Sequence, residues 1–150
     1  MKGDFMDERE HLSNIRDLIK SEYDPELARH YGADEYGMKR YILAFLRRGP
    51  KKPKTKAEAD RLQKAHLENI SRLARDGSLI LAGPFLDEGD LRGIYLFDTE
   101  SLEEAQKLVE SDPAIQAKSL VMELKEWYGS AALMAVPQIH PMVEKRSVAE

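Results

Sequence analysis

Apolar residues recur through the middle of the chain with two spacings, one typical of strands and one typical of helices. Short apolar runs of strand length occupy residues 41–46, 79–84 and 91–97, and residues 120–125 alternate apolar and polar side chains. Two stretches between these runs have helical spacing: Ala59, Leu62, His66, Ile70 and Leu73 share one face, and so do Leu102, Ala105, Leu108 and Val109. The resulting order, β-α-β-β-α-β over residues 41–127, predicts an α+β protein with the ferredoxin-like plan.

Capping residues mark the ends of both predicted helices. Thr55 stands three residues before Glu58, and Ser101 stands three residues before Glu104, which is the spacing of a capping box. Gly77 suits the left-handed exit of the first helix. Pro113 blocks continuation of the second helix and disfavours helical geometry at Asp112.

The flanks of this unit have a different character. Leu12, Ile15, Leu18 and Ile19 follow helical spacing, and a second short helix fits residues 24–32, where Asp24 is a cap and Gly32 an exit. Residues 1–36 are therefore predicted to be a helical N-terminal extension, and residues 37–129 the main domain. Residues 130–150 form a tail too apolar for a free end, so we expect it to pack on the domain or on a partner subunit.

One face of the predicted sheet has no helix to cover it. Both helices of this plan lie on the same side, and strand four presents Val121, Glu123, Lys125 and Trp127 on the other. Strand one is apolar on both faces. Because an exposed apolar face usually marks an interface, we expect a homodimer whose two sheets pack face to face.

Length and charge exclude several classes of protein. The 150 residues suit one domain with appendages, and a net charge of −4 with mixed signs argues against binding to nucleic acid. One basic run, residues 47–56, is either a solvated loop or an anion contact. Since the chain has no cysteine, it has no disulfide, thiol nucleophile or cysteine-based zinc site. No apolar run is long enough to cross a membrane, and no secretory signal is visible, so a cytoplasmic location is expected.

Several short pieces, taken in order, resemble a known family. They are His66-Leu67, Asp76-Gly77, Leu81-Ala82-Gly83-Pro84 and Asp112-Pro113. Residues 39–128 resemble the YciI-like family (YCII-related domains), within the dimeric α+β barrel group that includes muconolactone isomerase. Residues 89–95 and 127–133 resemble a narrower subgroup described as muconolactone-isomerase-like.

The resemblance implies an enzyme with a histidine and an aspartate in a cleft. The matching positions are His66 and Asp112. This sequence departs from the pattern at Lys125-Glu126, where the nearest relatives are expected to have His-Pro before the tryptophan. If that histidine serves the site, this chain has lost it.

The residues themselves leave two interpretations of the histidine. His66 stands on the apolar stripe where a leucine would be expected, either as a general base or acid, or as a buried neutral imidazole satisfied by a neighbour. Asp112 would orient the imidazole, or it simply ends a helix before proline. Antiparallel packing of the two helices would bring Asp112 towards His66.

The turn after the second strand supplies the other candidates. Arg92 has a planar fork that suits a substrate carboxylate, or it forms a surface ion pair with Asp90. Asp87, Glu88 and Asp90 also suit a solvated turn. Tyr95 and Trp127 suit the core or an interface as well as a ligand. The predicted site has His66 and Asp112 as catalytic residues and Arg92, Asp90 and Tyr95 as substrate-binding residues.

No metal or cofactor is expected. His66 has no second histidine at helical spacing, and His11, His30 and His140 lie outside the core domain. The sequence predicts a cofactor-independent enzyme that moves a proton on a small anionic or carbonyl-bearing molecule, through isomerisation, lactone chemistry or hydrolysis. The alternative is a non-catalytic dimeric module that binds a metabolite or a protein through its cleft and helical extension.

Overall fold

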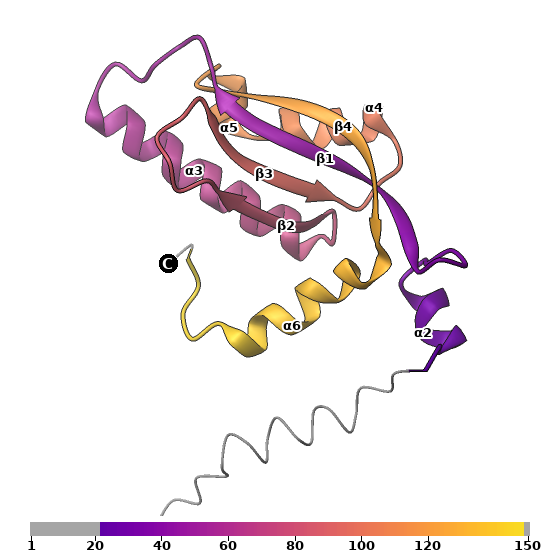
Figure 1. Ribbon diagram of the computed structural model, residues 1–150. Coiled ribbons are helices and arrows are strands. Elements are labelled where there is room, and N and C mark those ends of the chain that lie inside the picture. Colours follow the sequence, from indigo (N-terminus) through magenta and orange to yellow (C-terminus); the bar gives the residue numbers. More distant parts are fainter. Residues whose placement is uncertain (1–21, 149–150) are drawn as a thin grey trace, which may run out of the picture.

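The computed structural model describes residues 22–148, and its centre is one antiparallel four-stranded sheet (Figure 1). The strands are β1 (Met38–Arg48), β2 (Leu79–Pro84), β3 (Leu91–Phe97) and β4 (Leu120–Ser130). Their order across the sheet is β2-β3-β1-β4, and every neighbouring pair is antiparallel. This order confirms the predicted α+β, ferredoxin-like plan.

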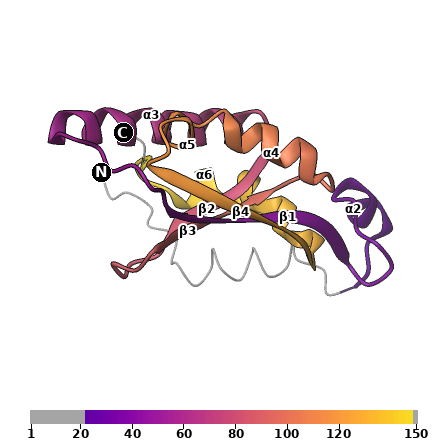
Figure 2. The same ribbon diagram turned by 90° about the horizontal axis from the view of Figure 1, so that it is seen from above.

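Three helices cover one face of the sheet. They are α3 (Lys56–Arg75), α4 (Leu102–Glu110) and α5 (Pro113–Gln116), and Figure 2 shows them in a single layer. The Thr55 hydroxyl accepts a hydrogen bond from the Glu58 amide, and the Ser101 hydroxyl accepts one from the Glu104 amide. Both predicted N-caps are therefore present and start α3 and α4 at the expected residues. The return bond of each capping box is not formed, because Glu58 accepts from the Lys54 amide and the Ser101 amide donates to the Thr99 hydroxyl.

The main core lies between the sheet and this helical layer. β1 contributes Ile42 and Ala44, β3 contributes Tyr95 and Phe97, and α3 contributes Leu73, all of them buried. The alternation along β1 sends Tyr41 and Leu43 to the opposite face. As a result, β1 contributes buried side chains to both faces of the sheet.

The chain after β4 returns across the second face of the sheet. A 3-10 helix, η1 (Ala131–Ala135), leads into α6 (Val136–Val143), which lies beside β2 (Figure 1). Leu133, Met134 and Val136 pack against a second core of Tyr41, Ile80 and Leu96. Part of the face opposite the helices is thus covered by the chain's own tail.

Helix α2 (Pro25–His30) precedes the sheet. The Asp24 carboxylate accepts hydrogen bonds from the amides of Glu26 and Leu27, and Gly32 has φ of +70°, as its cap and exit residues predict. The helix predicted from Leu12, Ile15, Leu18 and Ile19 lies outside the described residues. Between residues 22 and 148, no helix has both the length and the hydropathy that crossing a bilayer requires.

The structure contains helices that sequence patterns did not predict. Asp112-Pro113 ends α4 as expected, but it also begins α5, because proline suits the first position of a helix as well as the position after one. The tail forms α6 although it contains Pro137 and Pro141. Strands β1 and β4 extend beyond the apolar runs that predicted them.

Candidate active site

His66 lies on the buried side of α3, facing the sheet. Its residue is 7% exposed, in a helix whose other buried positions are Asn69 and Leu73. Position 66 follows Leu62 by four residues and precedes Ile70 by four, so the helical period fixes its direction. An imidazole at this depth needs partners for both ring nitrogens.

Asp112 supplies the partner for one nitrogen. It is the N-cap of α5 and is fully buried, at 0% exposed. Its Oδ1 accepts a hydrogen bond from the Ala114 amide at 2.9 Å, and its Oδ2 lies 2.5 Å from His66 Nδ1. The same carboxylate therefore caps a helix and holds the imidazole of another. Oδ2 is thus within hydrogen-bond distance of the ring nitrogen.

Tyr95 supplies the partner for the other nitrogen. Its hydroxyl oxygen lies 3.1 Å from His66 Nε2. On the sheet Tyr95 stands between Ala44 of β1 and Ala82 of β2, whose small side chains leave space for the ring. Burial, and secondarily the negative charge of Asp112, raises the pKa of the Tyr95 phenol above its ordinary value. The phenol is therefore neutral at physiological pH.

A cavity of about 260 Å³ adjoins this group. Its polar lining comes from His66 and Gln63 of α3 and from Tyr95 and Arg92 of β3. Its apolar lining consists of Leu46, Ile70, Ala82, Pro84, Leu120 and Val148. An apolar hollow with a few converging polar groups is the usual form of a small-molecule site.

Arg92 borders the cavity and is held in place by backbone. Its Nη1 donates to the carbonyl oxygens of Asp87 at 3.1 Å and Gly89 at 3.2 Å. Among the described residues, no carboxylate lies within ion-pair distance of Arg92. Its charge is therefore available to an anion in the cavity.

Asp90 does not join the site. Its carboxylate lies 3.7 Å from the Arg47 guanidinium, is largely exposed, and does not border the cavity. The turn residues Asp87 and Glu88 are exposed as well. The acidic turn positions Arg92 through its carbonyl oxygens rather than through its carboxylates.

Two polar residues near the site were not predicted from the sequence. Gln63 borders the cavity one helical turn before His66. Asn69, 6% exposed, accepts hydrogen bonds from Arg72 at 2.5 Å and from Ser111 at 3.3 Å, which ties α3 to the end of α4 beside Asp112. Gln63 and Asn69 stand three residues before and three residues after His66, which places all three on one side of the helix. This spacing is the feature of the sequence that could have indicated them.

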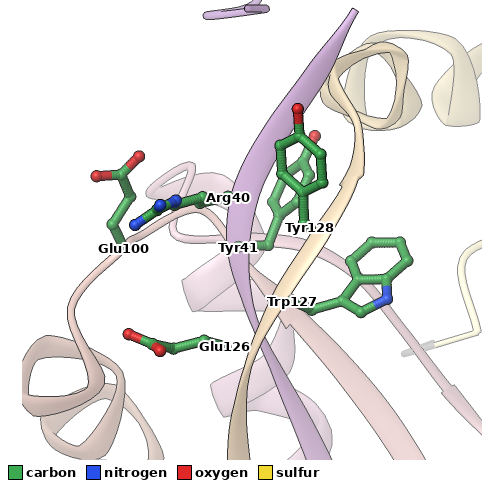
Figure 3. A pocket seen from close by; sticks show the side chains of 6 residues that line it. All are labelled: Arg40, Tyr41, Glu100, Glu126, Trp127 and Tyr128. Carbon is green, nitrogen blue, oxygen red and sulfur yellow. The ribbon is translucent and has the colours of Figure 1, made fainter. Parts of the chain in front are cut away.

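A second hollow, of about 210 Å³, lies at the β1–β4 side of the sheet (Figure 3). Arg40, Glu100 and Glu126 lie to one side of the paired strands, and Trp127 lies to the other (Figure 3). Arg40 and Glu126 are both exposed. No buried ionisable pair lines this hollow. The cavity beside His66, which has such a pair, is therefore the better candidate for an active site.

Of the other histidines, the two that the structure describes, His30 and His140, do not border the cavity. His140 forms an exposed pair with Glu144, His30 is exposed, and His11 lies outside the described residues. Across residues 22–148, no three histidine, aspartate or glutamate side chains converge as metal ligands would. The arrangement at His66 is instead suited to moving a proton, because a buried carboxylate orients an imidazole beside a cavity.

Comparison with known proteins identifies the family. The family model for the YCII-related domain matches residues 43–128. The uncharacterized protein YjpA of Bacillus subtilis (strain 168) is 36% identical over 62 residues, which cover 41% of this chain and 71% of YjpA. A solved structure, 5-chloro-2-hydroxyhydroquinone dehydrochlorinase (TftG) from Burkholderia phenoliruptrix AC1100 in complex with 2,5-dihydroxybenzoquinone, is similar with 22% identity and a TM-score of 0.43, over 57% of this chain and 92% of that one. Because the family model spans more than half of the sequence, the chain belongs to the YCII-related domain family, as residues 39–128 predicted.

Proposed function

We propose that this protein is a small enzyme that moves a proton on a small anionic molecule bearing a carbonyl group. His66 acts as general base and acid, and Asp112 orients it and balances the charge of the imidazolium. Isomerisation, lactone chemistry and hydrolysis all use such a step, and none of them requires a cofactor here. The proposal rests on one observation above all: the buried His66–Asp112 pair adjoins a cavity instead of being sealed in the core.

The cavity lining supports the proposed class of substrate. Arg92 offers a guanidinium without a carboxylate partner among the described residues, which suits an anionic group. Leu46, Ile70 and Leu120 offer apolar contacts to the rest of the molecule. At about 260 Å³ the cavity lies just below the range of about 300–1,000 Å³ that is usual for ligand sites, so the substrate is small. Of the predicted substrate-binding residues we retain Arg92 and Tyr95 and leave out Asp90.

Exchange of carbon-bound hydrogen tests the proposal without knowledge of the natural substrate. The probes are acetoacetate, oxaloacetate and levulinate in D₂O, and the measurement is deuterium incorporation next to the carbonyl by NMR. We expect exchange with at least one probe, and a loss of about 100-fold or more in His66→Ala, which is the usual contribution of a general base. His140→Ala, which removes an exposed histidine, should match the wild type.

Two outcomes would count against catalysis. Equal exchange by wild type and His66→Ala would show that the imidazole is not the base. Absence of exchange with every probe, together with thermal stabilisation by the same compounds, would favour the alternative of a non-catalytic binding module.

We also propose that two copies associate through the face opposite the helices. The tail covers only part of this face, and Phe45, Ile94 and Val121 remain partly or largely exposed beyond it. Their side is set by the pairing of Phe45 with Ile94 and of Arg47 with Val121. Sedimentation should give a dimer at micromolar concentration, and Phe45→Lys should weaken it; a monomer at all concentrations would contradict the proposal.

A further inference from the structure

The Tyr95 hydroxyl is hydrogen-bonded to Nε2 of His66, the ring nitrogen that would exchange a proton with a substrate. Tyr95 is 3% exposed, and its oxygen lies 3.1 Å from Nε2. The two rings stack with centroids 6.2 Å apart and an interplanar angle of 22°. On its other side the Tyr95 ring meets Phe97 edge-on at 5.9 Å. The phenol is thus a fixed part of the site.

The hydrogen-bond network assigns a direction to each proton. An ionised carboxylate only accepts hydrogen bonds, and Asp112 already accepts one from the Ala114 amide. His66 Nδ1 therefore carries the proton that points to Asp112 Oδ2, at 2.5 Å. Nε2 is left with a lone pair, so Tyr95 donates its hydroxyl proton to it.

The hydrogen bond from Tyr95 leaves two routes by which a substrate proton could reach Nε2 of His66. The lone pair that would take a proton is already occupied by the phenol. Either the Tyr95 ring swings away, or the proton passes through the Tyr95 oxygen. The ring is nearly fully buried between Phe97 and His66, so a swing would require the core to open.

We propose that Tyr95 is a catalytic residue that relays the proton between substrate and His66. The substrate C–H bond breaks and its proton goes to the Tyr95 oxygen, while the original hydroxyl proton goes to Nε2. The electron pair stays on the substrate as an enolate, and the imidazolium faces the Asp112 carboxylate. The reverse sequence returns a proton to a different atom and completes an isomerisation. This relay rests on the proposed function and assigns the residue that touches the reacting atom.

The environment of the phenol agrees with a concerted transfer. Burial and the charge of Asp112 raise the pKa of Tyr95, which disfavours a free tyrosinate. One proton must then arrive as the other leaves. Asp112 in turn stabilises the positive charge once it reaches the imidazole ring.

Tyr95→Phe, assayed by the same hydrogen exchange, tests the relay. The matched control is Tyr41→Phe, which removes another buried hydroxyl, one bonded to the Ser130 carbonyl on the opposite face of the sheet. We expect Tyr95→Phe to lose about 100-fold or more in kcat with little change in KM, and Tyr41→Phe to keep its rate. A Tyr95→Phe rate equal to or above the wild type would overturn the relay. It would show that His66 takes the proton directly once the hydroxyl bonded to Nε2 is removed.

A measurement on the wild type keeps the test independent of how variants fold. Release of tritium from a labelled probe is compared in H₂O and D₂O. In the relay the Tyr95 hydron, which exchanges with solvent, moves in the same step, so release should slow clearly in D₂O. Direct removal by His66 moves no solvent-derived hydron, and equal rates would reject the relay.

The two proposals fail in different ways. Loss of exchange in His66→Ala with full activity in Tyr95→Phe would leave the histidine as base and reject only the relay. Equal exchange in His66→Ala and wild type would reject the proposed function itself. Nitrogen NMR of the His66 ring adds a check without substrate: a proton on Nε2 instead of Nδ1 would contradict the assigned direction of both hydrogen bonds.

Discussion

Asp112 Oδ2 lies 2.5 Å from His66 Nδ1, although the two residues are 46 positions apart in the chain. Their meeting depends on the packing of α5 against α3, because Asp112 is the N-cap of the four-residue helix α5. One oxygen holds the helix start and the other holds the imidazole. The carboxylate therefore has a structural and a chemical role that different substitutions can separate.

Asp112→Asn should remove the chemical role and keep the structural one. The asparagine oxygen still accepts from the Ala114 amide, since asparagine is as good an N-cap as aspartate. Its NH₂ group, facing Nδ1, would favour the other histidine tautomer, with the proton on Nε2. We expect exchange activity to fall about 10²–10⁴-fold with little change in the urea midpoint. Activity within a few-fold of the wild type would show that Asp112 does not orient the base.

Asp112→Ala should cost stability as well. The lost cap is worth about 0.5–2 kcal/mol, and the unpaired imidazole N–H about 1–3 kcal/mol more. Urea unfolding measures both, with Asp24→Ala, the exposed cap of α2, as the control for a cap alone. If the two alanine variants lose equal free energy, the buried contact with His66 adds nothing to the fold.

The fold was largely predictable because its signals are local. Strands β2 and β3 begin and end where the apolar runs do, and Thr55 and Ser101 cap α3 and α4 as their spacing requires. The short helix α5 escaped prediction, since Asp-Pro has the same local preferences after one helix as before another. The tail helices escaped it because their stability comes from packing on Tyr41, Ile80 and Leu96, which no local pattern reveals.

The candidate site was only partly predictable, because it depends on contacts distant in sequence. His66 stood out as a polar residue on an apolar stripe, and its family resemblance pointed to Asp112. The hydrogen bond from Tyr95 requires the register that places Tyr95 between Ala44 and Ala82 under α3. From the sequence, Asp90 was as good a candidate for substrate binding as Arg92. In the structure the β1–β3 pairing is irregular between Leu46 and Arg47, and Asp90 forms an ion pair with Arg47 instead.

Arg92→Met should weaken binding of anionic probes more than it slows the chemical step. Arg92 borders the cavity, and its guanidinium has no carboxylate partner among the described residues, so its loss should remove an attraction that substrate and transition state share. We expect KM to rise about 10-fold or more, which corresponds to about 1.4 kcal/mol, with kcat changed less. Arg47→Met, at an exposed ion pair, is the control. Equal KM values in the two variants would exclude Arg92 as the anion contact.

Gly93→Ala should destabilise the sheet, whereas Gly83→Ala should not. A Cβ at position 93 would lie 2.6 Å from the Gly83 carbonyl oxygen, a backbone atom that cannot move without disturbing the β2–β3 pair. We expect a loss of about 1–3 kcal/mol in urea unfolding. A Cβ at position 83 meets nothing within 4 Å, so that variant keeps its stability. Equal stability of the two variants would contradict this account.

Alkaline pH should destabilise the protein through Tyr95. Burial and the charge of Asp112 raise the pKa of this phenol in the folded state, so the folded chain holds its proton more tightly than the unfolded chain does. The stabilisation is complete below the ordinary tyrosine pKa of about 10 and is lost as pH rises above it, by about 1.4 kcal/mol per pH unit. Tyr95→Phe has no such proton, so its free energy of unfolding should fall less steeply between about pH 10 and 11. Tyr36→Phe, at a ring 77% exposed, should follow the wild type. Parallel curves for wild type and Tyr95→Phe would mean that the phenol ionises as readily in the fold as in the unfolded chain, and the concerted relay would lose its electrostatic support.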